Sequence, residues 1–422
     1  AMDAARPFAG LQVVEFGQFI AVPYCAQLLA EGGAHVIKVE SLEGDPVRHL
    51  APLAPGETRH FISRNRGKRS LPLDLRHPRA GDVIDRLLAR ADVVLTNFRP
   101  GLAVELGLDW ASLEPRYPRV VVGNVSAFGR RGPDAGLAGM DMVVQARSGL
   151  MATLGRMQDG VPAAGDAPIA DYMCAMTLAF GIAAALLRRE RTGRGGEVDV
   201  ALFMAALTLQ NNSLVRVAAT DGAPQAAALA RLAQMRAAGR PFEEQADTMP
   251  STRTPGMTNV YYRTYATKDT AVAVACVSPG LQRTFIDAIG LTDAAHTGTV
   301  ADPAAHYAAL RERAEAAFAA RTSAEWKRIF DARGVPGAAV RFAVEMLDDE
   351  QALANGLFHD LAHPSVGRVR VLAPPLAMDG AGFQPAAPTA AFGSQARAIL
   401  GEIGFGEGEI DELLNARVSQ AG

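Results

Sequence analysis

Asp171 is the residue whose type and position best suit covalent chemistry. It follows Pro168 and opens a long apolar stretch, 171–190, whose composition predicts a buried helix. The free amides and the dipole at a helix N-terminus favour an anion, and an ionised carboxylate can attack an acyl group. A helix-capping aspartate occupies the same kind of position, so the local pattern leaves both interpretations open.

Most other patterns that carry chemistry are missing from the sequence. It has no GxGxxG after a predicted strand, no GxxxxGK[ST], no GxSxG and no HExxH. The glycines at 129–139 have the wrong spacing for a dinucleotide loop. The three cysteines and eight histidines are scattered without metal-ligand spacing. We therefore expect no bound metal and no nicotinamide cofactor.

The elements that must position Asp171 alternate between strands and helices. Strands are predicted at 11–16, 35–40, 92–96, 119–126 and 196–203, and helices at 22–31, 82–91, 141–150 and 171–190. This alternation predicts an α/β fold with a Rossmann-like parallel sheet, covered by helices, that binds ligands at the carboxyl ends of its strands.

The pattern changes in the middle of the chain. Residues 261–277 have the pattern of two short strands around a turn, and 303–334 that of two helices, which indicates a smaller α+β domain. We predict the N-terminal part of a large domain at 1–205, a linker at 206–235, the small domain at 236–345, and a linker with a C-terminal part that returns to the large domain at 346–422.

Composition limits the classes of function. With 42 basic and 45 acidic residues among 422, the net charge of -3 provides no field suited to nucleic acid. The longest apolar run, 173–187, is shorter than a membrane span. Three distant cysteines give no disulfide framework, which fits a reducing cytoplasm. We expect a cytoplasmic protein without nucleic-acid or membrane partners.

Ordered segments of the chain resemble the family III CoA-transferases of the CaiB/BaiF type, a group that includes formyl-CoA transferases and has the α-methylacyl-CoA racemases as close relatives. The segments are GAHVIKVES and GDPVR within 33–48, NRGKRSLPLDL at 65–75, TNFRPG at 96–101, FGRRGP at 128–133, GMDMVVQARSGLM at 139–151, APIADY at 167–172 and ALLRRERTGRGGEVDVAL at 185–202. Two C-terminal segments, 359–376 and 399–414, are also similar, so the resemblance covers most of the chain.

The resemblance implies a homodimer of two interlocked rings and a nucleophilic role for Asp171. CoA would pass from an acyl-CoA donor to a carboxylic acid acceptor through an aspartyl mixed anhydride and an aspartyl-CoA thioester. The segment 1–205 would bind CoA, and no cofactor would be bound permanently. Contacts to CoA would come from Ile20, Ala21, Lys38, Leu73, Asp74, Leu75, Arg76, Asn97, Phe98, Arg99, Ala138, Met140 and Asp141. Amides of 17–22 and of the loop around Gly256 would stabilise the oxyanions.

Several positions depart from the family pattern. Ser41 and Glu105 replace arginines of the formyl-CoA transferases, Ile20 replaces a glutamine, and the glycine-rich flap is reduced to 255–257. These departures argue against oxalate or formate as substrates. Arg156, Arg253, Tyr261 and Tyr262 are candidates to meet a second carboxylate.

Two alternative functions remain. The related racemases have a histidine at the position of Met140, so a two-base racemase would lack one base here although Asp141 keeps the adjacent carboxylate. A non-catalytic acyl-CoA-binding protein would keep the fold without needing Asp171.

Overall fold

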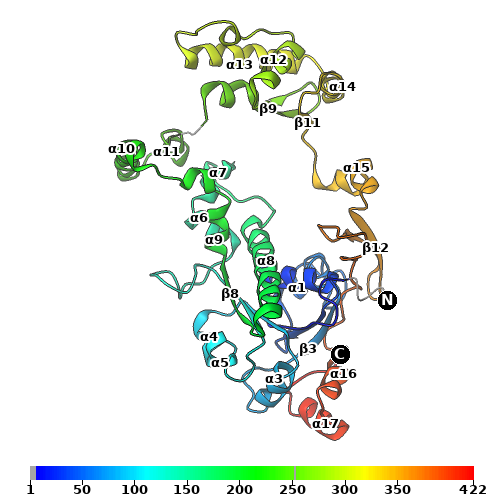
Figure 1. Ribbon diagram of the computed structural model, residues 1–422. Helices are drawn as coiled ribbons and strands as arrows, with labels where there is room; N and C mark the ends of the chain where they lie inside the picture. The colour runs from blue at the N-terminus through cyan, green and yellow to red at the C-terminus, as the bar shows by residue number, and fades with distance from the viewer. Residues whose placement is uncertain (1–5, 251–252) are drawn as a thin grey trace. The chain divides into compact units, whose positions relative to one another are not determined.

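The computed structural model describes residues 6–250 and 253–422. The chain folds into two compact units (Figure 1). Unit 1 combines Ala1–Gly222, Arg240–Ala246 and Leu353–Gly422, and unit 2 combines Ala223–Gly239 and Asp247–Ala352. This division assigns 206–222 to the first unit and 223–235 to the second, whereas the sequence predicted one linker over both. Residues 1–5 of the predicted first segment lie outside the described residues.

Unit 1 is built on a six-stranded sheet whose order is β3-β2-β1-β4-β5-β8, with every neighbouring pair parallel. Its strands are β1 (Gln12–Glu15), β2 (His35–Glu40), β3 (Lys68–Pro72), β4 (Val93–Thr96), β5 (Val121–Ser126) and β8 (Gly196–Ala201). The predicted α/β class with a large parallel sheet is therefore confirmed. The strand order reverses between β1 and β4, which is where sheets of this kind bind ligands.

Apolar side chains alternate between the two faces of this sheet, as the strand period requires. Val13 packs with α1 (Ala21–Glu31) and α8 (Ile169–Thr192), whereas Val14 packs with α3 (Ala80–Leu88) and α16 (Ala396–Glu402). The helices accordingly cover both faces (Figure 1). The last helix, α17 (Glu407–Asn415), belongs to the second of these cores.

Helix α8 is the long apolar helix that the sequence predicted, and it begins two residues earlier and ends two residues later than expected. It ends at Gly193, whose φ of 74° is a conformation that glycine adopts easily. By length and hydropathy alone α8 would suffice to cross a membrane. One of its faces nevertheless packs in the core, where Gly181 permits close approach because a Cβ there would lie 2.5 Å from Val198 Cγ1.

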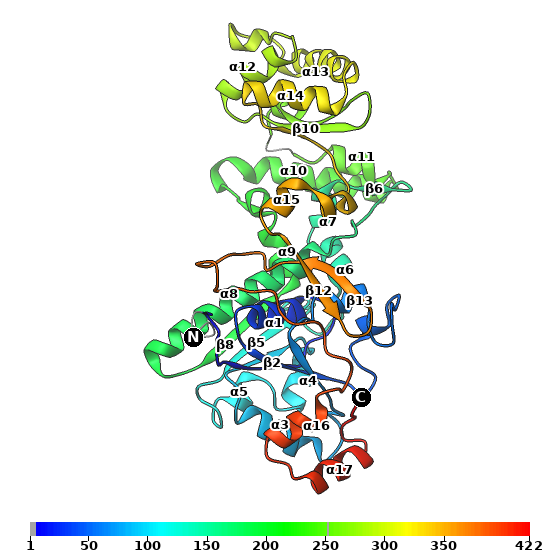
Figure 2. The same ribbon diagram turned by 90° about the vertical axis from the view of Figure 1, so that its right-hand side faces the viewer.

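The C-terminal part of the chain completes unit 1. Strands β12 (Phe358–His363) and β13 (Gly367–Leu372) form an antiparallel hairpin (Figure 2). The extended segment that follows lies against the first part of the chain, since Gly67 N–H donates to Ala387 O at 2.8 Å. Near the C-terminus, Ser419 forms an isolated bridge to Leu73, directly after β3.

Unit 2 contains a three-stranded antiparallel sheet of order β11-β10-β9, formed by β9 (Tyr262–Ala266), β10 (Ala271–Ala275) and β11 (Gly337–Ala339). Its aromatic core includes Tyr265 and Phe318, whose rings stack with centroids 4.2 Å apart. The predicted strand pair and the helices α13 (Pro303–Ala319) and α14 (Ser323–Arg333) are confirmed. Helix α12 (Pro279–Ala288) and strand β11 were not predicted.

The remaining elements are short, with one exception. They are α2 (Arg59–Ile62), α4 (Pro100–Glu105), α5 (Trp110–Leu113), α6 (Asp141–Arg147), α7 (Leu150–Leu154), β6 (Met157–Gln158), β7 (Val161–Pro162), α9 (Leu202–Thr208), α11 (Phe242–Asp247), α15 (Glu350–Ala354) and single turns at Pro46–His49, Asn211–Leu214, Met257–Tyr261, Ala294–His296 and Ala343–Asp348. The exception is α10 (Ala218–Ala237), a 20-residue helix. Much of the stretch predicted as a linker is therefore helical.

Candidate active site

Asp171 lies in the first turn of α8, where it is the third residue of the helix. The N-cap position belongs to Pro168, so the capping interpretation of Asp171 is wrong. The residue is only 8% exposed. Within residues 6–250 and 253–422, no hydrogen bond reaches its carboxylate oxygens, so both oxygens keep their lone pairs for chemistry.

A second buried carboxylate stands beside Asp171. Asp141, the first residue of α6, is also 8% exposed, and its Oδ2 accepts the backbone N–H of Asp171 at 2.9 Å. Its other oxygen, Oδ1, accepts a hydrogen bond from Gln145 Nε2. The sequence placed Asp141 among the CoA contacts, and the structure brings it directly to the candidate nucleophile.

Burial raises the pKa of Asp171 to about 7, and the negative charge of Asp141 pushes in the same direction. The guanidinium of Arg64 opposes this rise in the pKa. Arg64 is itself buried, and its Nε donates to the hydroxyl of Tyr172 at 3.4 Å. A carboxyl group with a pKa near 7 is ionised in about half of the molecules at neutral pH, and its anion is poorly solvated and reactive.

The loop between β1 and α1 is held in one conformation. A Cβ on Gly17 would lie 2.2 Å from Val22 Cγ1, so only glycine fits there. Phe19 has a φ of 65°, a left-handed conformation rare for a bulky residue, and its N–H donates to Asp45 Oδ1 at 3.3 Å. Ile20 is the N-cap of α1 and Ala21 its first residue, so the predicted oxyanion donors include free helix N–H groups.

Helices α1 and α8 are joined close to these groups. The rings of Tyr24 and Tyr172 meet edge to face with centroids 4.9 Å apart. Tyr172 directly follows Asp171, and Tyr24 follows the N-terminus of α1 by one turn. The loop amides and the candidate nucleophile are therefore parts of one packed assembly within unit 1.

A cavity of about 320 Å³ lies at the carboxyl ends of β1, β2, β3 and β4, next to the switch in strand order. Five of the predicted CoA contacts line it, namely Leu73, Asp74, Leu75, Arg76 and Phe98, together with Phe16, Gln18, Val39, Glu40, Ser41, Leu42 and Glu43. An aromatic ring, apolar walls and one arginine suit a nucleotide base with a phosphate nearby. Two predicted segments far apart in sequence thus meet at one cavity.

Asn97 does not line this cavity but holds Gln18, which does. Its Nδ2 donates to Gln18 O at 2.8 Å, and its Oδ1 accepts from Gln18 N at 3.1 Å, which ties the ends of β4 and β1 together. Phe98 then packs against Phe16 with centroids 6.1 Å apart. Arg99 is exposed at the N-cap of α4 and does not line the cavity.

Lys38 is not placed to contact a phosphate. It is only 1% exposed, and its ammonium lies 3.2 Å from Glu15 Oε1, 2.9 Å from Asp45 Oδ2 and 2.7 Å from Gly17 O. These partners use all three of its N–H groups, since a buried ammonium must be paired. Lys38 therefore holds the end of β1 and the loops after β1 and β2 together rather than a ligand.

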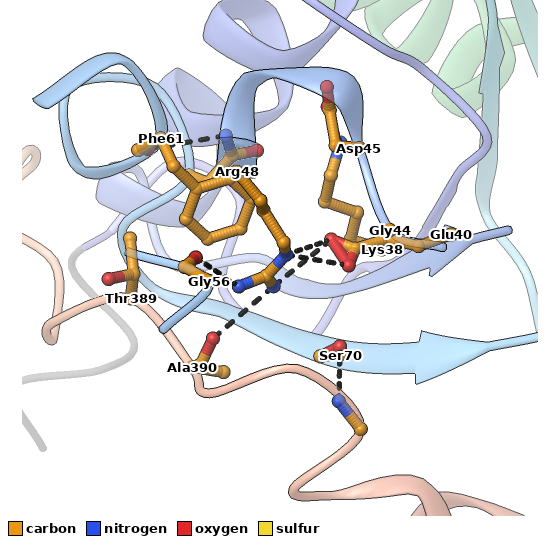
Figure 3. A network of polar contacts seen from close by, with 12 residues as sticks. Lys38, Glu40, Gly44, Asp45, Arg48, Gly56, Phe61, Ser70, Thr389 and Ala390 are labelled. Carbon is orange, nitrogen blue, oxygen red and sulfur yellow. Dashed lines mark hydrogen bonds and ion pairs between the residues drawn. The ribbon is translucent and has the colours of Figure 1, made fainter. Parts of the chain in front are cut away.

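Glu40, which lines the cavity, is fixed by the network of Figure 3. Arg48 Nε lies 2.9 Å from Glu40 Oε2, and the other guanidinium nitrogens donate to the carbonyls of Gly56 and Ala390 at 3.1 and 3.4 Å. The guanidinium also stacks 3.6 Å from the ring centre of Phe61. The cavity wall at β2 is therefore rigid.

The other predicted residues are more scattered. Ala138 and Met140 are exposed just before α6, where Met140 is its N-cap. Tyr261 is buried in the core of unit 2 and donates to Asp293 Oδ2 at 2.6 Å, so it does not face a substrate in this structure. Among the described residues, no group of three or more His, Cys, Asp or Glu side chains could hold a metal ion.

Arg64 and Gln145 were not among the residues predicted from the sequence. Gln145 follows Asp141 by four residues, which is the spacing that places two side chains on one face of a helix, so this contact was open to prediction. Arg64 follows α2 and reaches Tyr172 across 108 residues of sequence, so no local signal could reveal it.

Comparison of this chain with known proteins identifies the family to which it belongs. The family model described as CoA-transferase family III matches residues 8–394. The chain belongs to this family. As a member of CoA-transferase family III it is a transferase, and the resemblance drawn from the motifs is confirmed.

Curated relatives of this family member carry names for several acid substrates. Cinnamoyl-CoA:phenyllactate CoA-transferase of Clostridium sporogenes is 28% identical, over 96% of this chain and 95% of its own. The probable fatty acyl-CoA transferase Rv3272 of Mycobacterium tuberculosis is 31% identical over 84% and 88%. A crystal structure of Rv3272 has a TM-score of 0.75 at 26% identity, over 94% and 99%. A CaiB/BaiF family protein from Brucella suis has a TM-score of 0.72 at 27% identity, over 94% and 99%.

Proposed function

We propose that this family III member moves CoA from an acyl-CoA donor to a carboxylic acid acceptor, with Asp171 as the covalent nucleophile. The observation that carries the proposal is a buried carboxylate without a hydrogen-bond partner among the described residues, at a helix N-terminus and beside a second buried carboxylate. The names of the relatives, which exchange CoA between organic acids, support the reaction type.

In the first half of the reaction, the Asp171 carboxylate attacks the thioester carbonyl carbon of the donor. The C–S bond breaks, CoA leaves as a thiolate, and the donor acyl group forms a mixed anhydride with Asp171. The thiolate then attacks the aspartyl carbonyl carbon, which releases the donor as a free carboxylate and leaves an aspartyl-CoA thioester.

In the second half, the acceptor carboxylate attacks the aspartyl-CoA carbonyl and forms a new anhydride while the CoA thiolate departs. Attack of that thiolate on the acceptor carbonyl gives the new acyl-CoA and regenerates the Asp171 carboxylate. No net proton transfer is needed, and each addition passes through an oxyanion. The free N–H groups at the start of α1 are the proposed donors to these oxyanions.

We further propose that the cavity at the strand ends takes the nucleotide part of CoA. Phe98 offers an aromatic face to adenine, and Arg76 offers a cation to a phosphate. The acids Glu43 and Asp74 also line the cavity, so affinity for the phosphates must depend on few cations.

The proposed homodimer is supported by an apolar surface on unit 1. Phe180 on α8 is 78% exposed, and Met176, Leu187 and Met204 are also exposed on α8 and α9. Monomeric proteins rarely leave a large contiguous apolar patch in water, whereas a second copy would cover one. Sedimentation velocity of the wild type and of a Phe180→Glu variant tests this, and a wild type that sediments as a monomer would contradict it.

The nucleophile is tested by an Asp171→Ala variant assayed for CoA exchange between isotope-labelled acids. The matched control is Asp166→Ala, since Asp166 is an exposed aspartate in the preceding loop. We expect wild type and control to exchange CoA and to form, with acyl-CoA alone, a covalent adduct detectable by intact mass and cleaved by hydroxylamine. Asp171→Ala should form neither the adduct nor the product, and wild-type activity in that variant would refute the assignment.

A further inference from the structure

Gln145 is a buried side chain whose only described hydrogen bond leads to the candidate active site. It is 1% exposed, and its Nε2 donates to Asp141 Oδ1. Its Oε1 has no hydrogen-bond partner among the described residues, although that atom is buried. A buried amide oxygen without a partner is unfavourable by about 1 to 3 kcal/mol in typical proteins. The cost of that unpaired oxygen calls for a role of Gln145 besides stability.

The hydrogen bonds around Asp141 form a short chain. Gln145 Nε2 holds Oδ1, and the backbone N–H of Asp171 holds Oδ2 at 2.9 Å. The two donors fix the plane of the Asp141 carboxylate. The charge of this carboxylate lies next to the Asp171 carboxyl group, on which the proposed reaction depends.

We infer that Gln145 is a positioning residue, which orients the Asp141 carboxylate so that it anchors the first turn of α8 under the nucleophile. This inference rests on the proposed function of Asp171. Gln145 does not line the cavity proposed for CoA, so its effect should reach the chemical steps without altering nucleotide binding.

The groups that face the two carboxylates are few. Helix α8 brings Asp171, Tyr172 and Cys174, and the segment after α2 brings Arg64. The helices α7 and α9, which pack against α6, contain no titratable side chain. When Gln145 no longer donates, Oδ1 of Asp141 loses the contact that fixes its orientation, so the carboxylate can turn away from Asp171. The like charge of Asp141 then raises the pKa of Asp171 less, and Asp171 stays ionised at lower pH.

The test compares Gln145→Leu with a matched control, Gln210→Leu. Gln210 is also buried, but it bonds to Ser148 O, Ala206 O and Thr153 rather than to Asp141. For Gln145→Leu we expect kcat to fall about tenfold, as for loss of a hydrogen bond to a charged group. We also expect the acid limb of the pH profile of kcat, where kcat falls as the pH is lowered, to move to lower pH. KM for the acyl-CoA should be unchanged. Gln210→Leu should melt at a lower temperature but keep the wild-type limb.

A double variant sharpens the result. In an Asp141→Asn background, Gln145→Leu should not move the acid limb further, because the group that it acts on is already neutral. Gln145→Met, of similar length and without a donor, replaces Gln145→Leu if that variant fails to fold. An acid limb that stays at the wild-type position in the Gln145 variant overturns the inference, whatever the fall in kcat. A wild type that transfers no CoA would refute the proposed function instead.

Discussion

Replacing Asp171 by asparagine should make the protein more stable, and more so at high pH. The pKa of Asp171 rises from its ordinary 3.8 to about 7. The folded state therefore prefers the neutral acid, and this stabilisation is complete below the unfolded pKa and lost as the pH rises through about 7. About three pKa units correspond to about 4 kcal/mol, which the ionised wild type gives up above pH 7. Asparagine has the same shape and never ionises.

Urea unfolding of wild type and Asp171→Asn near pH 5 and near pH 8.5 measures this effect. Near pH 5 the wild type has already lost about 1.6 kcal/mol of its free energy of unfolding. The difference in the free energy of unfolding between the variant and the wild type should therefore grow by about 2 to 3 kcal/mol between the two pH values. Asp166→Asn, at an exposed site, should show no such growth. A stability difference that is the same at both pH values would mean that the Asp171 site does not favour the protonated acid. The same variant should lack transferase activity, so stability and function oppose each other here.

Three further changes test the surrounding structure. Asp141→Asn keeps an oxygen that can accept the Asp171 N–H but removes the like charge. The acid limb of the pH dependence of kcat should therefore move down by about one pH unit. A limb that does not move in a pH–rate profile would show that the two carboxylates are not coupled. Phe98→Ala should raise KM for acyl-CoA about fivefold and leave kcat unchanged, because about 1 kcal/mol of stacking is lost. Steady-state kinetics with CoA donors of different acyl groups would measure this. Arg48→Met leaves Glu40 buried without its charged partner and should destabilise the protein by about 3 to 5 kcal/mol in urea unfolding. Adding Glu40→Gln to Arg48→Met should recover part of that loss, and no recovery would contradict the ion-pair argument.

The strands of the large sheet were predictable because most are short runs of apolar, β-branched residues. β1 and β2 were found to within one residue at each end. β3 was not found as a strand, since it begins with Lys68 and Arg69. Lys68 can be buried there because its ammonium lies 2.8 Å from Glu15 Oε2, on another strand, and also donates to the Pro23 carbonyl and to Asn65 Oδ1 at 2.8 Å each. Pairing across the sheet thus overrides what the local sequence favours.

The candidate site shows the same limit. The sequence placed Asp171 near the start of a helix, but its environment depends on Asp141, thirty residues earlier in the chain. Lys38 was predicted as a CoA contact, because a lysine in a strand is expected at the surface and within reach of a ligand. The carboxylates of Glu15 and Asp45 draw it inside. Residue type and spacing identified which segments meet, and tertiary pairing decided what each side chain does there.

The hydrogen bonds of the C-terminal segment have a consequence for synthesis of the chain. Arg48 reaches Ala390 across 342 residues, and Ser70 Oγ accepts the N–H of Gly393. A chain emerging from the ribosome makes the first strands early, but these bonds must wait until Ala390 and Gly393 have been translated. All of unit 2 appears in the interval. The cavity wall at β2 is therefore completed only after unit 2 has been translated, and until then the unfinished unit 1 is where a chaperone would be needed most.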